Sequence, residues 1–89
     1  MPRYLVVDAD LAGFAQYQQL EADADGLWWV VRQIDEHPAG ARRYGAGAVV
    51  VDDWGMLSDQ PSTASELDDD ELTTPITADE FERRWNDAC

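Results

Sequence analysis

Two short apolar runs, separated by a polar segment, most constrain what this chain can fold into. Residues 27–34 (LWWVVRQI) and 47–54 (GAVVVDDW) are rich in valine and tryptophan. These residue types favour strands, and both runs are too short for typical buried helices. Residues 35–40 (DEHPAG) between them are turn formers. We therefore expect an antiparallel hairpin with a long or bulged connection, and residues 41–44 are a candidate extension of its second strand.

Two further elements are expected before this hairpin. Residues 3–8 (RYLVVD) have the short β-branched pattern of a strand. Asp10 can cap a helix over residues 11–22, whose apolar side chains recur at every third position: Leu11, Phe14, Tyr17 and Leu20. Gly26 then provides a stop for this helix.

The end of the chain carries the clearest helix signal. Thr77 and Glu80 have the spacing of a capping box, in which the hydroxyl and the carboxylate satisfy free amides at a helix start. Ile76 and Phe81 flank this box at the positions of a hydrophobic staple. We therefore expect a helix over residues 78–87.

These elements predict one α+β domain spanning residues 1–89. Its order is β-α-β-β, with a mainly antiparallel three-stranded sheet, followed by an acidic surface loop over residues 58–74 and a C-terminal helix. The loop is rich in turn formers and acids, and we expect one short helical turn within it, over residues 65–72. The apolar fraction of 45% and the four tryptophans supply a core for a small domain of this length.

The chain carries a large negative charge. Nineteen carboxylates oppose six arginines, without a lysine, for a net charge of −13. The charge is uneven, because residues 52–89 hold twelve of the carboxylates and two of the arginines. Such a field repels nucleic acids and anionic membranes and attracts cationic partners, such as a basic protein surface or a metal ion. Adaptation to salt or a coding bias would give the same composition, and both explanations stay open.

The residues needed for most catalytic chemistries are missing or badly placed. His37 is the single histidine and lies in a predicted turn, and Cys89 is the single cysteine and the last residue. One histidine and one cysteine cannot complete a tetrahedral zinc site. We therefore expect a binding protein rather than an enzyme, without cofactors. The single cysteine and the short apolar run near the N-terminus favour the cytoplasm, without excluding a disulfide to another chain.

Three aspartates at predicted strand ends support a different hypothesis, a metal-dependent enzyme. Asp8, Asp10 and Asp53 lie at or just after the ends of predicted strands, and neighbouring strand ends could bring them together around Mg²⁺, which prefers carboxylates and water. The sequence YLVVDAD resembles the first motif of response-regulator receivers and of haloacid-dehalogenase-type phosphatases. Both families require a later lysine, which this chain lacks. This hypothesis therefore ranks below the alternatives that follow.

An acidic run in the expected loop is the main candidate for a binding site. Its carboxylates repel one another unless solvent or a cation screens them. The leading hypothesis is an acidic inhibitor or adaptor of a basic protein, such as a nucleic-acid-binding protein, acting as a nucleic-acid mimic. Nuclease immunity proteins and viral proteins that imitate DNA against host defence are functional analogies. The candidate partner-binding acids are Glu66, Asp68, Asp69, Asp70 and Glu71 in the run, and Asp79, Glu80 and Glu82 on the terminal helix.

The tryptophan pair Trp28 and Trp29 supports an alternative, assembly through an apolar face. Side chains of a regular strand alternate between its two faces. One face would then carry Leu27, Trp29, Val31 and Gln33, and the other Trp28, Val30, Arg32 and Ile34. Unless helices cover both faces, one tryptophan is left for a partner or for a second copy of the chain, as in a homodimer or a subunit of a larger particle.

Overall fold

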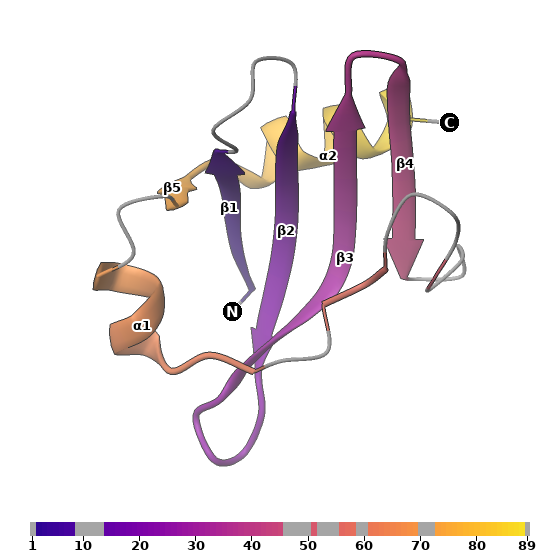
Figure 1. The fold of residues 1–89 in the computed structure, drawn as a ribbon. Helices are drawn as coiled ribbons and strands as arrows, with labels where there is room; N and C mark the ends of the chain where they lie inside the picture. Colours follow the sequence, from indigo (N-terminus) through magenta and orange to yellow (C-terminus); the bar gives the residue numbers. More distant parts are fainter. Residues whose placement is uncertain are drawn as a thin grey trace.

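The structure, a computed structural model, describes residues 2–8, 14–45, 51, 56–58, 61–69 and 73–88. In this part, five strands form one antiparallel sheet in the order β4-β3-β2-β1-β5, with two helices beside it (Figure 1). The elements are β1 (Arg3–Asp8), β2 (Ala15–Ala22), β3 (Trp28–His37), β4 (Gly40–Gly45), α1 (Ala64–Asp69), β5 (Thr73–Pro75) and α2 (Ala78–Asp87). The α+β class is thereby confirmed, whereas the three-stranded sheet and the β-α-β-β order are wrong.

The second element is the main departure from the predicted order. Residues 15–22 form β2 rather than part of a helix, and β2 pairs with β1 on one side and β3 on the other. Tyr17 and Leu20 are both buried, but each belongs to a different hydrophobic cluster. Their three-residue spacing places them on opposite faces of a strand, and burial on two faces outweighs the helical pattern. The predicted cap, Asp10, lies outside the described residues.

β3 does form an antiparallel hairpin, but with residues 40–45 rather than with the predicted strand over residues 47–54. β3 extends to His37, which pairs with Gly40, so the connection is short rather than long. β4 follows at once, over the segment expected only as an extension. Of the predicted strand over residues 47–54, the structure describes Val51, which forms an isolated bridge with Met56.

A β-bulge divides β3 into two parts. Across the bulge, the alternation of side chains between the two faces of the sheet shifts by one residue. Arg32 pairs with Gln19, but Val30 pairs with the next residue of β2, Leu20, so Val31 is the extra residue. Because of this shift, Val30 and Trp28 share the face of Gln33, while Trp29 shares the face of Arg32. The expected alternation is therefore correct from Arg32 onward and wrong before it.

Gly45 of β4 makes room for this bulge. It pairs with Arg32 and has a φ of 85°, in the left-handed region that favours glycine. A Cβ at this position would lie 2.4 Å from the carbonyl oxygen of Val31. Only glycine fits here without moving the bulge.

The sheet separates two hydrophobic clusters, one on each face. On the first face, α2 crosses the strands (Figure 1) and its buried Phe81 and Trp85 pack on Tyr17 and Ile34. On the second face, the buried residues are Leu5, Leu20 and Val30, with Trp28, Leu57 and Leu67 packed against them. The second cluster thus reaches α1 through Leu67, a residue of that helix.

The terminal helix α2 has the predicted bounds and the predicted start. The hydroxyl of Thr77 accepts a hydrogen bond from the backbone N–H of Glu80 at 3.1 Å. Ile76 packs against the cluster that contains Phe81, as a hydrophobic staple requires. Of the helices in the described part, neither is long and apolar enough to span a membrane.

The expected loop over residues 58–74 contains more structure than predicted. Helix α1 begins at a second capping box, in which Glu66 N–H donates to the Thr63 hydroxyl at 3.2 Å and Thr63 N–H donates to the Glu66 carboxylate at 3.0 Å. The end of the segment pairs with β1 as the edge strand β5. The acidic run therefore begins in a capped helix and is followed by a strand of the sheet.

Candidate protein-binding surface

The predicted acids on α1 have different surroundings. Glu66 serves the capping box, and its hydrogen bonds from Thr63 lower the pKa of its carboxyl. Asp68 forms an ion pair with Arg3 of β1. Asp69 is exposed, while Asp70 and Glu71 lie outside the described residues. Among the acids of α1 that the structure describes, Asp69 is thus the one that neither caps the helix nor pairs with the sheet.

Two of the three predicted acids on α2 hold the helix to the sheet or to itself. The Glu82 carboxylate accepts two hydrogen bonds from the guanidinium of Arg32, which lower the pKa of Glu82. Glu80 forms an ion pair with Arg84 at 3.6 Å, one turn along the helix. Asp79 is exposed.

The two helices lie on opposite faces of the sheet, so their acids do not form one flat surface. Leu67 of α1 packs with the second-face cluster, whereas Phe81 of α2 lies in the first-face cluster. In the chain, the edge strand β5 lies between α1 and α2 (Figure 1). A flat partner surface that covers α1 would therefore not also cover α2.

A third acidic segment, at the tip of the β2–β3 hairpin, was not predicted as a site. Glu21, Asp23 and Asp25 are exposed there. The Asp23 carboxylate accepts hydrogen bonds from the Trp29 indole N–H at 2.9 Å and from the backbone N–H of Leu27 at 3.0 Å. These bonds, led by that of Trp29, lower the pKa of Asp23. The sequence signal for this turn is DADG, just before β3. Such a segment is typical of a hairpin turn when a strand also precedes it, and residues 15–22 form that strand.

The two tryptophans of β3 have different exposure. Trp28 is half-buried against the second-face cluster, and the guanidinium of Arg3 lies 5.3 Å from the centre of its ring. Trp29 lies on the other face and is 40% exposed. Trp29 is therefore the tryptophan of this pair that a partner can reach directly.

Backbone pairing joins the hairpin tip to α1. Trp28 N–H donates to Ser62 O at 2.7 Å, and Ser62 N–H donates to Trp28 O at 3.0 Å. Helix α1 begins two residues after Ser62, at Ala64. This pairing joins the base of the hairpin tip to the segment that leads into α1; in Figure 1 the tip lies at the bottom and α1 lies at the left of the sheet.

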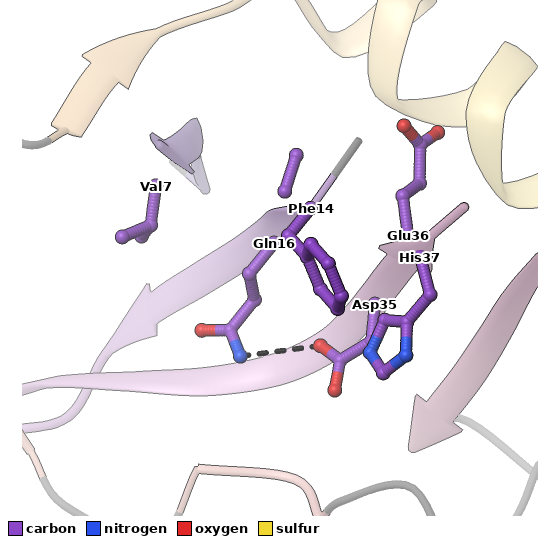
Figure 2. A pocket seen from close by; sticks show the side chains of 7 residues that line it. Val7, Phe14, Gln16, Asp35, Glu36 and His37 are labelled. Carbon is purple, nitrogen blue, oxygen red and sulfur yellow. Dashed lines mark hydrogen bonds between the residues drawn. The ribbon is translucent and has the colours of Figure 1, made fainter. Parts of the chain in front are cut away.

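The opposite end of the sheet carries a pocket of about 260 Å³ (Figure 2). The Gln16 amide donates to the Asp35 carboxylate at 3.1 Å, as does the Gln33 amide, and the Phe14 and His37 rings lie 4.9 Å apart. His37 thus ends a strand beside a ring, rather than lying in a solvated turn. The pocket is lined by Val7, Phe14, Ala15, Gln16, Asp35, Glu36 and His37.

The hypothetical metal site is placed only in part. Asp8 ends β1, while Asp10 and Asp53 lie outside the described residues. Among the residues that the structure describes, no three acids, histidines or cysteines are grouped so as to hold a metal ion. Comparison of the chain with models of protein families, with curated proteins and with solved structures finds no match.

Proposed function

We propose that this chain is a small acidic protein that binds a basic surface of another protein and thereby inhibits or adapts that partner. The observation that carries the proposal is the pairing of Trp28 with Ser62. Without it, the hairpin tip and α1 would be two separate acidic segments. With it, they are joined within one folded domain.

The arrangement of the arginines supports this proposal. Arg32 and Arg84 form ion pairs with carboxylates of the chain itself, and Arg43 lies over the ring of Trp85. By contrast, three exposed acids at the tip and on α1 form no ion pair within the described part of the chain: Glu21, Asp25 and Asp69. Arg3, which pairs with Asp68, is the one arginine in the described residues with an ion pair to the tip or α1, so most of the carboxylates there are left unneutralised.

A surplus of this kind suits a partner whose groove binds phosphates. Carboxylates held on a rigid frame can occupy the positions of phosphates, and their field would accelerate association with a basic protein. We therefore propose a nucleic-acid-binding protein or complex as the partner class, with this domain as a nucleic-acid mimic of the immunity-protein or viral anti-defence type. Asp70 and Glu71 follow Asp69 in the sequence and belong to the same acidic run of the proposal.

A charge comparison between the two ends tests the proposal. A partner captured from the native host's lysate at low salt would be titrated with wild type and with two doubly substituted variants. Asp25→Asn/Asp69→Asn removes two charges from the proposed surface, and Asp79→Asn/Asp87→Asn removes two from α2. We expect the first variant to weaken binding about five- to tenfold and the second much less, because exposed pairs each contribute little and act locally.

Two results would contradict this proposal. Equal weakening by both variants would mean that total charge, rather than this end of the molecule, governs binding. A salt-tolerant complex that neither variant affects would favour assembly through apolar side chains, for which the exposed Trp29, Val51 and Met56 are the candidates.

A further inference from the structure

The indole of Trp29 is fixed in one orientation at the hairpin tip. Its N–H donates to one oxygen of Asp23 at 2.9 Å, and the other oxygen accepts from the backbone N–H groups of Asp25 and Leu27 at 2.9 and 3.0 Å. The ring is nevertheless 40% exposed. A side chain already ordered in this way loses little conformational freedom when a partner covers it.

The chain's own arginines show what its aromatic faces attract. Arg3 lies over Trp28 at 5.3 Å, and Arg32 and Arg43 lie over Trp85 at 5.0 and 5.1 Å from the ring centre. Of the tryptophans in the described residues, Trp29 is the one with no arginine of that part of the chain over its ring. Because the ring is 40% exposed, part of it is accessible to a cation from elsewhere.

The position beside this ring is occupied by a carboxylate. Glu21 pairs with Trp29 across the hairpin, so both side chains project from the same face of the sheet. Glu21 is exposed and forms no ion pair within the described part of the chain. A cation over the Trp29 ring would thus also reach an unneutralised acid.

We propose that Trp29 and Glu21 together bind an arginine side chain of the protein partner. Arginine is favoured over lysine because its planar guanidinium can stack on the indole while donating two hydrogen bonds to one carboxylate. This inference rests on the proposed function, since it names the group of the basic partner that this acidic end receives.

The test uses two probes of equal charge, hexa-arginine and hexa-lysine peptides with blocked termini. Each is titrated into the full ¹⁵N-labelled chain at 50 mM NaCl, and the indole N–H resonance of Trp29 is followed by NMR. Trp29→Phe assigns this resonance by its loss. We expect the resonance to shift with hexa-arginine, and Trp29→Leu to weaken hexa-arginine binding about three- to fivefold.

A matched pair of variants separates the acid beside the ring from general charge. Glu21→Gln and Asp25→Asn each remove one charge from the hairpin tip, but only Glu21 lies across from Trp29. We expect Glu21→Gln to remove the preference for hexa-arginine over hexa-lysine. Asp25→Asn should weaken both peptides alike and leave the preference intact.

The outcomes distinguish this inference from the proposed function. If hexa-arginine binds while the Trp29 resonance stays unmoved in wild type, the inference is wrong and the basic-partner proposal survives. Equal affinity for the two peptides would overturn the choice of arginine. If neither peptide binds, the proposed function itself fails. The wild-type resonance gives the first of these answers even if Trp29→Leu does not fold.

Discussion

The two helices begin with nearly the same sequence and yet are held very differently. Thr63–Glu66 (TASE) starts α1 and Thr77–Glu80 (TADE) starts α2. Helix α2 spans 10 residues and buries Phe81 and Trp85, whereas none of the 6 described residues of α1 is buried. A capping box therefore fixes where a helix begins, but the apolar residues that follow determine how firmly the rest of the protein holds it.

Polar contacts increase the difference between the helices. Side chains of α2 are tied to the sheet by the Arg32–Glu82 and Arg84–Glu36 ion pairs, the second at 3.1 Å. Helix α1 has the Arg3–Asp68 ion pair and the half-buried Leu67. Elements with few buried contacts open at lower free energy than the core, so α1 should open locally while α2 unfolds with the whole domain.

The largest effect is expected from removing the apolar contact of each helix. Phe81→Ala should lower the free energy of unfolding by about 3–5 kcal/mol, because it leaves a cavity in a fully buried site. Leu67→Ala should cost only about 1 kcal/mol, since the side chain is half-buried and its site can relax. Urea denaturation monitored by tryptophan fluorescence measures both values. Similar losses in the two variants would mean that α1 belongs to the same cooperative unit as α2.

Removing the caps should sharpen the same comparison. Thr77→Ala should lower the free energy of unfolding by about 1 kcal/mol, the usual cost of losing an N-cap. Thr63→Ala should lower it less, by at most the small free energy with which α1 closes onto the sheet. Hydrogen exchange would instead show faster exchange at Leu67 N–H, which donates to Thr63 O at 3.1 Å. Unchanged exchange at Leu67 would contradict local opening of α1.

The smallest expected effect depends on pH. Hydrogen bonds from Arg32 lower the pKa of Glu82 in the folded state. The resulting stability is therefore present above the unfolded pKa, about 4.3, and is lost as pH falls through the folded pKa. Glu82→Gln should cost at most about 1 kcal/mol at pH 7, because the carboxylate is partly exposed.

Denaturation of wild type and Glu82→Gln between pH 7 and pH 3 tests this expectation. The difference between the two should shrink steadily as the solution becomes more acidic. Glu66→Gln on α1 should have the same sign, since the pKa of Glu66 is lowered by Thr63, but should act on local opening. A difference for Glu82 that grows on acidification would disprove the assignment of its partner.

Local sequence signals were sufficient to predict the elements whose boundary residues and buried residues are neighbours in the sequence. The cap and staple around Thr77 correctly placed α2, and the short apolar runs placed β1 and β3. The short helical turn expected over residues 65–72 corresponds to α1, and the same capping rule, applied to Thr63 and Glu66, would have placed its start. By contrast, β2 was missed because its two buried residues face different clusters, which only the pairing with β1 and β3 reveals.

Of the candidate surface, only the part that is visible as a local sequence pattern was predicted. The acids of α1 were identified from their density along the chain. The hairpin tip was overlooked because a helix was expected to run into it, and Trp29 was not distinguished from Trp28 because a bulge cannot be seen in the pattern of one strand. The roles of Glu80 and Glu82 in holding α2 depend on arginines, which only the folded arrangement brings near.

The close approach of Gly45 to Val31 links a glycine of β4 to the orientation of two tryptophans in β3. Because Gly45 has no side chain, the bulge at Val31 fits, and the bulge determines which tryptophan is exposed. The bulge keeps Trp29 outward and Trp28 inward, and a methyl group at position 45 would collide with the carbonyl that the bulge projects. If the bulge were lost, regular alternation would exchange the two rings. A related protein with an unchanged hairpin tip but an alanine at this position would then display a different tryptophan on each face of the sheet, although no residue of the tip had mutated.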